Sequence, residues 1–318
     1  MSASPELTPQ QLADAPLLKA EGVSIEFGGL RALSDFHLTI RKGDLQGLIG
    51  PNGAGKTTAF NVLTGVYKPT RGEVRVGGTR VNKLKPHQIN HLGLARTFQN
   101  IRLFRALTAL DNVKVACRAE ALSDAAAHGV TGSLLAGAAM DLARGGLSAR
   151  MLALLVANWR TLLLVGWWKS LLLTPRFQAE ERRITEQAEH LLEVMGLSHR
   201  RDEEARNLPY GEQRRLEIAR ALGTRPKVLL LDEPAAGMNT REKADLMVLI
   251  RKLRDEFSLG ILVIEHDMKL VMGICEKITV LDHGETIARG APEQVRSDRK
   301  VIEAYLGDNY LETHGGAP

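Results

Sequence analysis

Short apolar runs bounded by charged or glycine residues recur along the chain and predict buried strands. Three such runs cover residues 45–49, 228–231 and 261–264. Runs of this length with little alternation between apolar and polar positions are typical of parallel strands that are covered on both faces. Other segments, such as 216–222, have the helical spacing of apolar positions. The pattern predicts a mainly parallel sheet flanked by helices, with polar residues at the carboxyl ends of its strands.

Outside these runs, the pattern predicts a β-rich N-terminal part, a helical middle part and a C-terminal hairpin followed by a helix. We expect a β-rich stretch up to about residue 81, with one strand at 72–76. Helix dominates from 107 to 222. Residues 278–289 form two short strand patterns around an Asp-His-Gly turn and predict a hairpin. Pro292 then begins a short helical tail.

The stretch 121–174 differs in composition from the rest of the chain. Glycine and alanine dominate its first part, and residues 148–173 then form an apolar stretch with the tryptophans Trp159, Trp167 and Trp168. Arg160 divides its uncharged runs, which are too short to span a bilayer. An apolar helix of this kind must be covered by its own helical subdomain, by a membrane partner or by the lipid interface. The sequence leaves these three hypotheses open.

Composition and charge limit the class of protein. A chain of 318 residues with 44% apolar content can bury a sizeable core. Its two cysteines, Cys117 and Cys275, stand in no metal-binding or redox spacing, which suits a reducing cytoplasm. Residues 1–16 lack the apolar core of a signal peptide and predict a disordered tail. The net charge of +5 suits a solvated basic surface or a surface near anionic lipid head groups.

A glycine-rich turn follows the run 45–49 directly and fits the pattern G-x-x-x-x-G-K-[ST]. A strand that ends in such a turn and opens a helix leaves unpaired N–H groups, which point at a bound anion together with the positive end of the helix dipole. The glycine order differs from the G-x-G-x-x-G of a dinucleotide fold or a kinase loop. The residues that we expect to bind a nucleotide here are Gly50, Pro51, Asn52, Gly53, Ala54, Gly55, Lys56, Thr57 and Thr58.

Two carboxylates, Asp232 and Glu233, end the run 228–231. In a phosphate site, one carboxylate can hold the Mg²⁺ shell while the other orients the attacking water. The same pair also occurs at plain strand ends. The run 261–264 ends in Glu-His-Asp, and its histidine, His266, has either a structural or a catalytic role.

Two more segments complete an ordered set of motifs. Arg-Thr-Phe-Gln-Asn occupies 96–100, and Leu-Pro-Tyr-Gly-Glu-Gln-Arg-Arg occupies 208–215. Along the chain, the five motifs occur in the order that is typical of the ATP-binding cassette (ABC) family of transport ATPases. The chain resembles this family over residues 17–115 and 175–308. The resemblance implies ATP and Mg²⁺ as cofactors and ATP hydrolysis as the reaction.

The resemblance also implies a role for each motif residue. Lys56 and Thr57 belong to the Walker A loop, and Thr57 and Asp232 would hold Mg²⁺. Gln99 would sense Mg²⁺ and face the membrane partner. The implied catalytic base is Glu233, the implied switch histidine on the γ-phosphate is His266, and the implied aromatic that stacks on adenine is Phe27. An aromatic residue at such a position is equally typical of a core.

The chain departs from the family pattern at two places. The signature Leu-Ser-Gly-Gly-Gln is here Leu-Pro-Tyr-Gly-Glu, so the serine hydroxyl is absent and Glu212 replaces the glutamine. The backbone N–H groups of Tyr210 and Gly211 at a helix N-terminus would still form an anion site. The run 228–231 with Asp232 and Glu233 corresponds to the Walker B motif of the family. After this motif, Asn239 stands where the family usually has aspartate.

The resemblance implies an α/β fold of the P-loop NTPase class. This fold would combine a RecA-like, mainly parallel sheet with an N-terminal antiparallel β part and an α-helical subdomain that carries an insertion. The expected boundaries are a cassette at 17–290, a helical subdomain at about 100–222 with the insertion at 121–174, and a C-terminal helical tail at 291–318.

Several strings, including 265–272 and 301–307, resemble the ATP-binding subunits of branched-chain amino-acid uptake systems. That resemblance implies two permease subunits, a second ATP-binding subunit of the same or a sister chain, an extracytoplasmic solute-binding protein, and a peripheral place at the cytoplasmic face of the membrane. Related cassettes serve urea or short-amide uptake and lipopolysaccharide export. A nucleic-acid-associated cassette is disfavoured, because the sequence has no long heptad pattern between Lys56 and Asp232 and carries one cassette.

Overall fold

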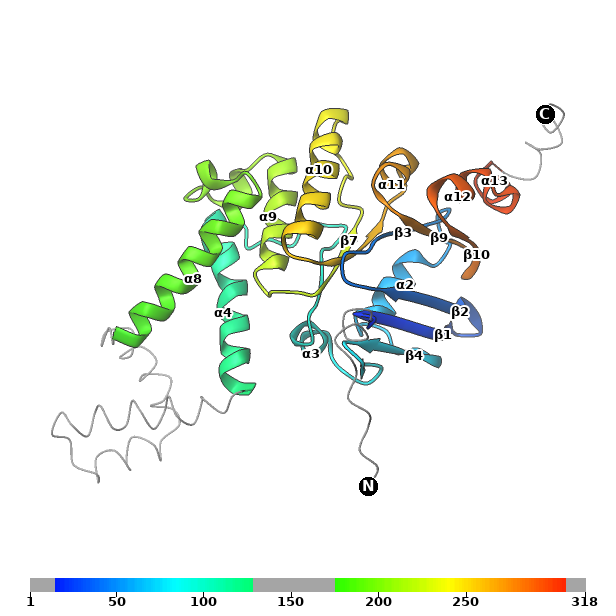
Figure 1. Ribbon diagram of the computed structural model, residues 1–318, viewed down its shortest axis with the longest axis horizontal. Coiled ribbons are helices and arrows are strands. Elements are labelled where there is room, and N and C mark those ends of the chain that lie inside the picture. Colours follow the sequence, from blue (N-terminus) through cyan, green and yellow to red (C-terminus); the bar gives the residue numbers. More distant parts are fainter. Residues whose placement is uncertain (1–14, 128–174, 307–318) are drawn as a thin grey trace, which may run out of the picture.

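A computed structural model describes residues 15–127 and 175–306 of the protein (Figure 1). Its larger sheet has six strands in the order β10-β9-β3-β8-β7-β6. All neighbouring strands in this sheet pair in parallel except β9 and β10. The strands are β3 (Leu45–Ile49), β6 (Leu94–Arg96), β7 (Val228–Asp232), β8 (Gly260–Ile264), β9 (Lys277–Asp282) and β10 (Glu285–Gly290).

The three apolar runs in the sequence form the centre of this sheet. Every residue of β3, β7 and β8 is buried, which confirms the prediction of parallel strands covered on both faces. Asp232 pairs in register with Ile264, so β7 and β8 end at the same edge. The polar residues that follow these two strands therefore meet in space. The predicted hairpin is confirmed as the antiparallel pair β9 and β10.

A second, antiparallel sheet of four strands forms the N-terminal part, as predicted, in the order β2-β1-β4-β5. Helix α2 (Lys56–Leu63), which the phosphate loop opens, shares one hydrophobic cluster with this sheet and with the larger one. The buried rings of Phe36 and Phe60 belong to that cluster. The strands are β1 (Leu18–Phe27), β2 (Leu30–Ile40), β4 (Arg71–Val76) and β5 (Thr79–Arg80).

Helices dominate the region around residues 109–222, and α4 lies alongside α8 at the left of Figure 1. This region contains α4 (Ala109–Ala127), α8 (Pro175–Val194), the 3₁₀ helices η1 (Ser198–Arg200) and η2 (Ala205–Asn207), and α9 (Tyr210–Leu222). The remaining helices are α3 (Pro86–His91), α10 (Thr240–Glu256), α11 (Met268–Ile274), α12 (Pro292–Ser297) and α13 (Arg299–Leu306). The predicted helix at 148–173 and most of the predicted N-terminal tail lie outside the described residues.

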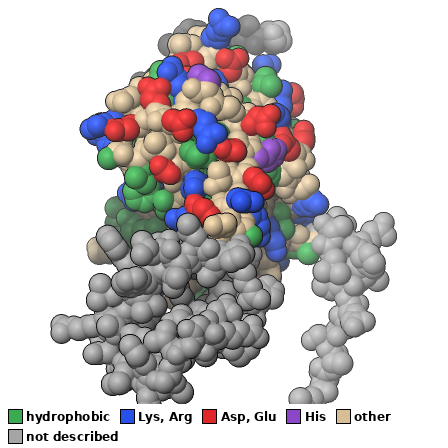
Figure 2. Space-filling model, turned by 90° about the vertical axis from the view of Figure 1, so that its left-hand side faces the viewer, with side chains coloured by type: hydrophobic (Ala, Val, Ile, Leu, Met, Phe, Trp, Pro, Cys, Tyr) green, Lys and Arg blue, Asp and Glu red, His purple; other side chains and the backbone are tan. Residues whose placement is uncertain are grey.

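Figure 2 shows the side of the molecule that lies at the left of Figure 1, where α8 is found. Acidic and basic side chains are interspersed on this face. Ion pairs join several of them, such as Lys114 with Glu181 at 2.6 Å and Arg201 with Glu189 at 2.6 Å. This mixture fits a solvated surface better than a basic patch on the described part of that face. Across residues 15–127 and 175–306, no helix has the length and hydrophobicity that a bilayer crossing requires.

Candidate functional site

The turn between β3 and α2 requires glycine at two positions, Gly50 and Gly55. Gly50 and Gly55 have φ angles of 152° and 99°. A Cβ atom at Gly50 would lie 2.1 Å from the carbonyl oxygen of Leu281, and one at Gly55 would lie 2.7 Å from that of Ala32. Both contacts are too short for a side chain. The loop therefore keeps its backbone close to Ala32 on β2 and Leu281 on β9 where it opens α2.

Lys56 is buried at the base of this loop. Its Nζ atom donates hydrogen bonds to the carbonyl oxygens of Gly50, at 2.7 Å, and Pro51, at 2.8 Å. Burial lowers the pKa of Lys56 below its ordinary value, while Glu233 and Asp232 act in the opposite direction. Thr57, the next residue, is exposed. A buried cation and an exposed hydroxyl group therefore stand next to each other in the sequence at the start of α2.

Glu233 lies directly after β7 with a φ angle of 47°, which is unusual for a residue with a side chain. Its backbone N–H donates to the carbonyl oxygen of Ile264, which fixes it beside the end of β8. Its Oε2 atom accepts a hydrogen bond from Gln99 Nε2 at 3.0 Å and lies 3.8 Å from His266 Nδ1. Strained backbone of this kind clusters at active sites. The structure therefore brings Gln99, Glu233 and His266 together.

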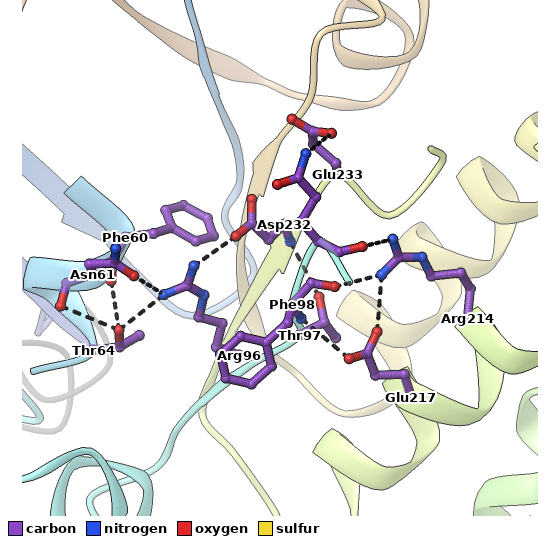
Figure 3. A network of polar contacts seen from close by, with 11 residues as sticks. Phe60, Asn61, Thr64, Arg96, Thr97, Phe98, Arg214, Glu217, Asp232 and Glu233 are labelled. Carbon is purple, nitrogen blue, oxygen red and sulfur yellow. Dashed lines mark hydrogen bonds and ion pairs between the residues drawn. The ribbon is translucent and has the colours of Figure 1, made fainter. Parts of the chain in front are cut away.

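Asp232 has a partner that the sequence analysis missed. Its Oδ2 atom lies 2.7 Å from Arg96 Nη2, and the two side chains are only 6% and 8% exposed. Arg96 ends β6, the strand next to β7. A charged residue that ends a short buried run was the available signal, but a partner 136 residues away is not visible in a sequence. Figure 3 shows the pair at the centre of a polar network.

A second buried pair, Arg214 with Glu217 on α9, holds the segment around Gln99. Arg214 donates to the carbonyl oxygens of Phe98, at 2.6 Å, and Gln99. Glu217 accepts from the backbone N–H groups of Phe98 and Arg102. Both side chains come from α9, the helix that the signature residues begin. Their hydrogen bonds therefore join the backbone around Gln99 to α9 (Figure 3).

The signature residues begin α9, whose N-cap is Pro209. The first N–H groups of a helix have no intrahelical acceptor. Of the two residues there, Tyr210 is 44% exposed and Gly211 is buried. The Tyr210 hydroxyl accepts a hydrogen bond from Arg214 at 3.1 Å, and its ring lies against Gly237. Glu212 instead turns toward η1, where its Oε2 lies 3.2 Å from Arg200 Nε.

The structure explains the asparagine after Walker B. Asn239 is the N-cap of α10: its side chain accepts from the Glu242 N–H at 3.0 Å, and Glu242 accepts from the Asn239 N–H at 2.9 Å. Asparagine and aspartate are comparable N-caps, so this departure preserves the helix start. Phe27 lies at the end of β1 and not in the cluster around Glu233. It is 45% exposed and meets the ring of Tyr67 edge-on at 5.2 Å.

The residues present fit a magnesium ion that also binds nucleotide phosphates. No group of three or more His, Cys, Asp or Glu side chains within the described ranges could hold a metal alone. Mg²⁺ bound with a nucleotide takes one or two protein oxygens, phosphate oxygens and waters. The Thr57 hydroxyl and the Asp232 carboxylate are oxygen donors of that kind.

A phosphate loop between a buried parallel strand and a helix, with two carboxylates at the end of another strand of the same sheet, defines a P-loop nucleotide hydrolase. A family model described as ABC transporter matches residues 33–236. A second model, described as branched-chain amino acid ATP-binding cassette transporter, matches residues 285–310. The chain therefore belongs to the ABC transporter family, whose cassettes bind and hydrolyse ATP.

Curated relatives agree over nearly the whole chain. This chain is 41% identical over 293 residues to the high-affinity branched-chain amino acid transport ATP-binding protein BraF of Pseudomonas aeruginosa. The matched region covers 92% of this chain and 98% of BraF. The chain is 40% identical, with the same coverage, to the LivG protein of the same description from Escherichia coli K12. The crystal structure of the ADP conformation of MJ1267, an ATP-binding cassette of an ABC transporter, matches with a TM-score of 0.68 and 28% identity over 92% of this chain and 100% of that chain.

Proposed function

We propose that this chain hydrolyses MgATP to energise the uptake of branched-chain amino acids through separate membrane subunits. The C-terminal match at residues 285–310 supports this substrate class, because that family model describes branched-chain amino acid cassettes. The two curated relatives carry the same substrate class in their names. The predicted fold class and the predicted ATPase activity are those of the family.

The observation that carries the proposal is the set of contacts at Glu233. Glu233, a carboxylate at a strained backbone position beside Gln99 and His266, would accept a proton from an attacking water. Lys56 and the loop N–H groups would bind the phosphates, and His266 would contact the γ-phosphate. Most of the rate enhancement would come from positioning and charge neutralisation.

Mg²⁺ would be held by Thr57 and Asp232, with Gln99 nearby. When bound, the ion would neutralise the charge of the phosphates. The remaining nucleotide contacts that we propose are Phe27 on the adenine and, from a second cassette, Tyr210, Gly211 and Glu212 on the phosphates. The place of Tyr210 and Gly211 at the N-terminus of α9 supports the contact from a second cassette, because the first N–H groups of a helix have no intrahelical acceptor.

We further propose that two such cassettes act with two permease subunits and an extracytoplasmic solute receptor, at the cytoplasmic face of the membrane. The cassette would comprise residues 17–290 and the helical subdomain about 100–222, with the insertion at 121–174 and a helical tail from 291. Whether the insertion is covered by its own helical subdomain, by a membrane subunit or by the lipid interface stays a prediction, because residues 128–174 lie outside the described residues.

Uptake measurements test the substrate class. In a strain of the source organism that lacks this gene, the wild-type chain should restore uptake of radiolabelled leucine, isoleucine and valine, whereas Glu233→Gln should not. Urea is the control solute, and its uptake should not depend on the gene. If urea uptake or lipopolysaccharide export depends on the chain while leucine uptake does not, the proposed substrate class is wrong.

A further inference from the structure

Arg96 is the only residue that joins the Walker A helix to the Walker B carboxylate by side-chain hydrogen bonds among the described residues. Its Nη2 atom donates to Asp232 Oδ2 at 2.7 Å. Its Nη1 atom donates to Asn61 Oδ1 on α2 at 2.7 Å and to Oγ1 of Thr64, the C-cap of that helix, at 3.4 Å. Figure 3 shows the guanidinium between the two elements. One side chain therefore fixes the spacing between α2 and the end of β7.

Two aromatic rings hold the guanidinium in place. Its Cζ atom lies 5.4 Å from the ring centre of Phe60 and 5.2 Å from that of Phe98. Cation–π contacts of this kind strengthen when they are shielded from water, and the Arg96 side chain is 8% exposed. The buried Nε atom makes no hydrogen bond within the described ranges. The orientation is thus set by Asp232, Asn61 and the rings, at the expense of one donor.

The contact uses one carboxylate oxygen and leaves the other. Arg96 binds Oδ2, and no hydrogen bond to Oδ1 of Asp232 is found in the part of the chain that the structure describes. Arg96 is held by Asn61, on α2, and by Thr64, at the C-cap of α2. These two residues follow Thr57 by about one and two helical turns. Arg96 thus approaches Asp232 from the side of the helix body, and Thr57 lies at the phosphate end of the same helix.

We propose that Arg96 is a positioning residue for the metal–nucleotide site: by holding Asp232 Oδ2, it presents Oδ1 to the cation that accompanies the nucleotide. This inference rests on the proposed role of Asp232 as the magnesium ligand. Loss of a side chain that orients a metal ligand lowers metal affinity or activity about 10-fold to 100-fold. Lysine would not replace Arg96, because it offers one nitrogen where the planar fork contacts two elements at once.

The test compares ADP binding to the full chain in excess Mg²⁺ and in EDTA, measured by calorimetry. The ratio of the two affinities reports the coupling between the metal and the nucleotide. In Arg96→Lys this ratio should fall about tenfold, while ADP affinity in EDTA stays within about twofold of the parent. Asn61→Ala removes one anchor of Arg96 and keeps the ion pair, so it should lower the ratio less. If Arg96→Lys does not fold, Asn61→Ala decides the question.

Arg254→Lys is the matched control. Arg254 is likewise an ion-paired arginine, with Asp255 and Glu276 as its partners, but its carbonyl oxygen accepts from the N–H of Leu259, just before β8 at the opposite edge of the sheet. It should leave the ratio unchanged. The inference is overturned if Arg96→Lys leaves the ratio unchanged, lowers both affinities equally or raises the ratio. If Asp232→Asn leaves the ratio unchanged, the assignment of Asp232 as the magnesium ligand is wrong instead.

Discussion

Two buried arginine–carboxylate pairs lie in the same polar network and differ in how completely their carboxylates are used (Figure 3). Glu217 receives hydrogen bonds on both oxygens, from Phe98 and Arg102 on Oε1 and from Arg214 on Oε2. Asp232 receives one on Oδ2, from Arg96. Both pairs are less than 10% exposed. Their environments are thus similar, and their hydrogen bonding differs.

The difference separates a structural pair from a functional one. Burying a charge is costly unless its hydrogen bonds are satisfied, and Glu217 meets this condition within the protein. Asp232 meets it only in part, which leaves an oxygen for a ligand from outside. The Arg214–Glu217 pair therefore shapes the backbone around Gln99, and the Arg96–Asp232 pair prepares a binding group. Substitutions in the first pair should change stability most, and those in the second should change nucleotide binding.

The largest effect on stability is expected from Arg214→Ala. It leaves Glu217 as a buried, unpaired carboxylate and removes the donor to the carbonyl oxygens of Phe98 and Gln99. Breaking a buried pair in this way costs about 3–5 kcal/mol. The measurement is the free energy of unfolding in urea, followed by circular dichroism. The adjacent Arg215→Ala, in a half-buried position, should cost less than about 1 kcal/mol. Equal losses in both variants would contradict the structural role of the pair.

A neutral contact near the same network should matter less than either ion pair. Asn239→Ala removes the side chain that accepts from the Glu242 N–H at the start of α10. Loss of such an N-cap costs about 1 kcal/mol of stability. Asn239→Asp keeps the acceptor and should be close to neutral. Thermal unfolding of the two variants checks this, and a loss in Asn239→Asp as large as that in Asn239→Ala would show that the cap is not the reason for the residue.

Glu265 extends the comparison to a buried carboxylate without an arginine, and the expected effect is a change in pH dependence. Its Oε1 accepts from the Ala235 N–H at 2.7 Å, and its Oε2 makes no hydrogen bond in the described residues. Burial raises the pKa of Glu265 above its ordinary value. The folded state therefore holds its proton more tightly than the unfolded state, so this group costs stability as pH rises above about 4 and through the folded pKa.

Glu265→Gln removes that titration and keeps the oxygen that accepts from Ala235. The stability of this variant relative to the parent should increase as the pH is raised through the same range. Urea unfolding at a series of pH values between about 4 and 8 measures the difference. A constant difference across the series would show that the Glu265 carboxyl does not titrate differently in the folded state.

Much of the fold could be predicted from the sequence because its signals are local. The runs that became β3, β7 and β8 are apolar without alternation, and the phosphate loop has a fixed spacing of glycines. The hairpin of β9 and β10 has a turn with Gly284 at its end. In each case the pattern that predicts the element lies within one short segment of the sequence.

The partners of the site residues could not be predicted in the same way. Arg96 and Asp232 are 136 residues apart, and β6, which positions Arg96, is only three residues long. The i,i+3 spacing of Arg214 and Glu217 is visible in the sequence, but the carbonyl oxygens that Arg214 binds belong to residues more than 100 positions away. The role of Asn239 as a cap required knowledge of where α10 begins. The hypotheses for 148–173 concern residues outside the described ranges and stay predictions.

The most direct test of the account is the rate of phosphate release from ATP in two single variants, Glu233→Gln and Glu265→Gln. Both change a carboxylate 3.8 Å from the ring of His266 to an amide. Glu233 contacts Gln99 at the site, whereas Glu265 is buried against Ala235. We predict that Glu233→Gln lowers the rate about a hundredfold or more, and that Glu265→Gln stays within a fewfold of the parent. A parental rate in Glu233→Gln, or an equal loss in both variants, would contradict the assignment of Glu233 as the base.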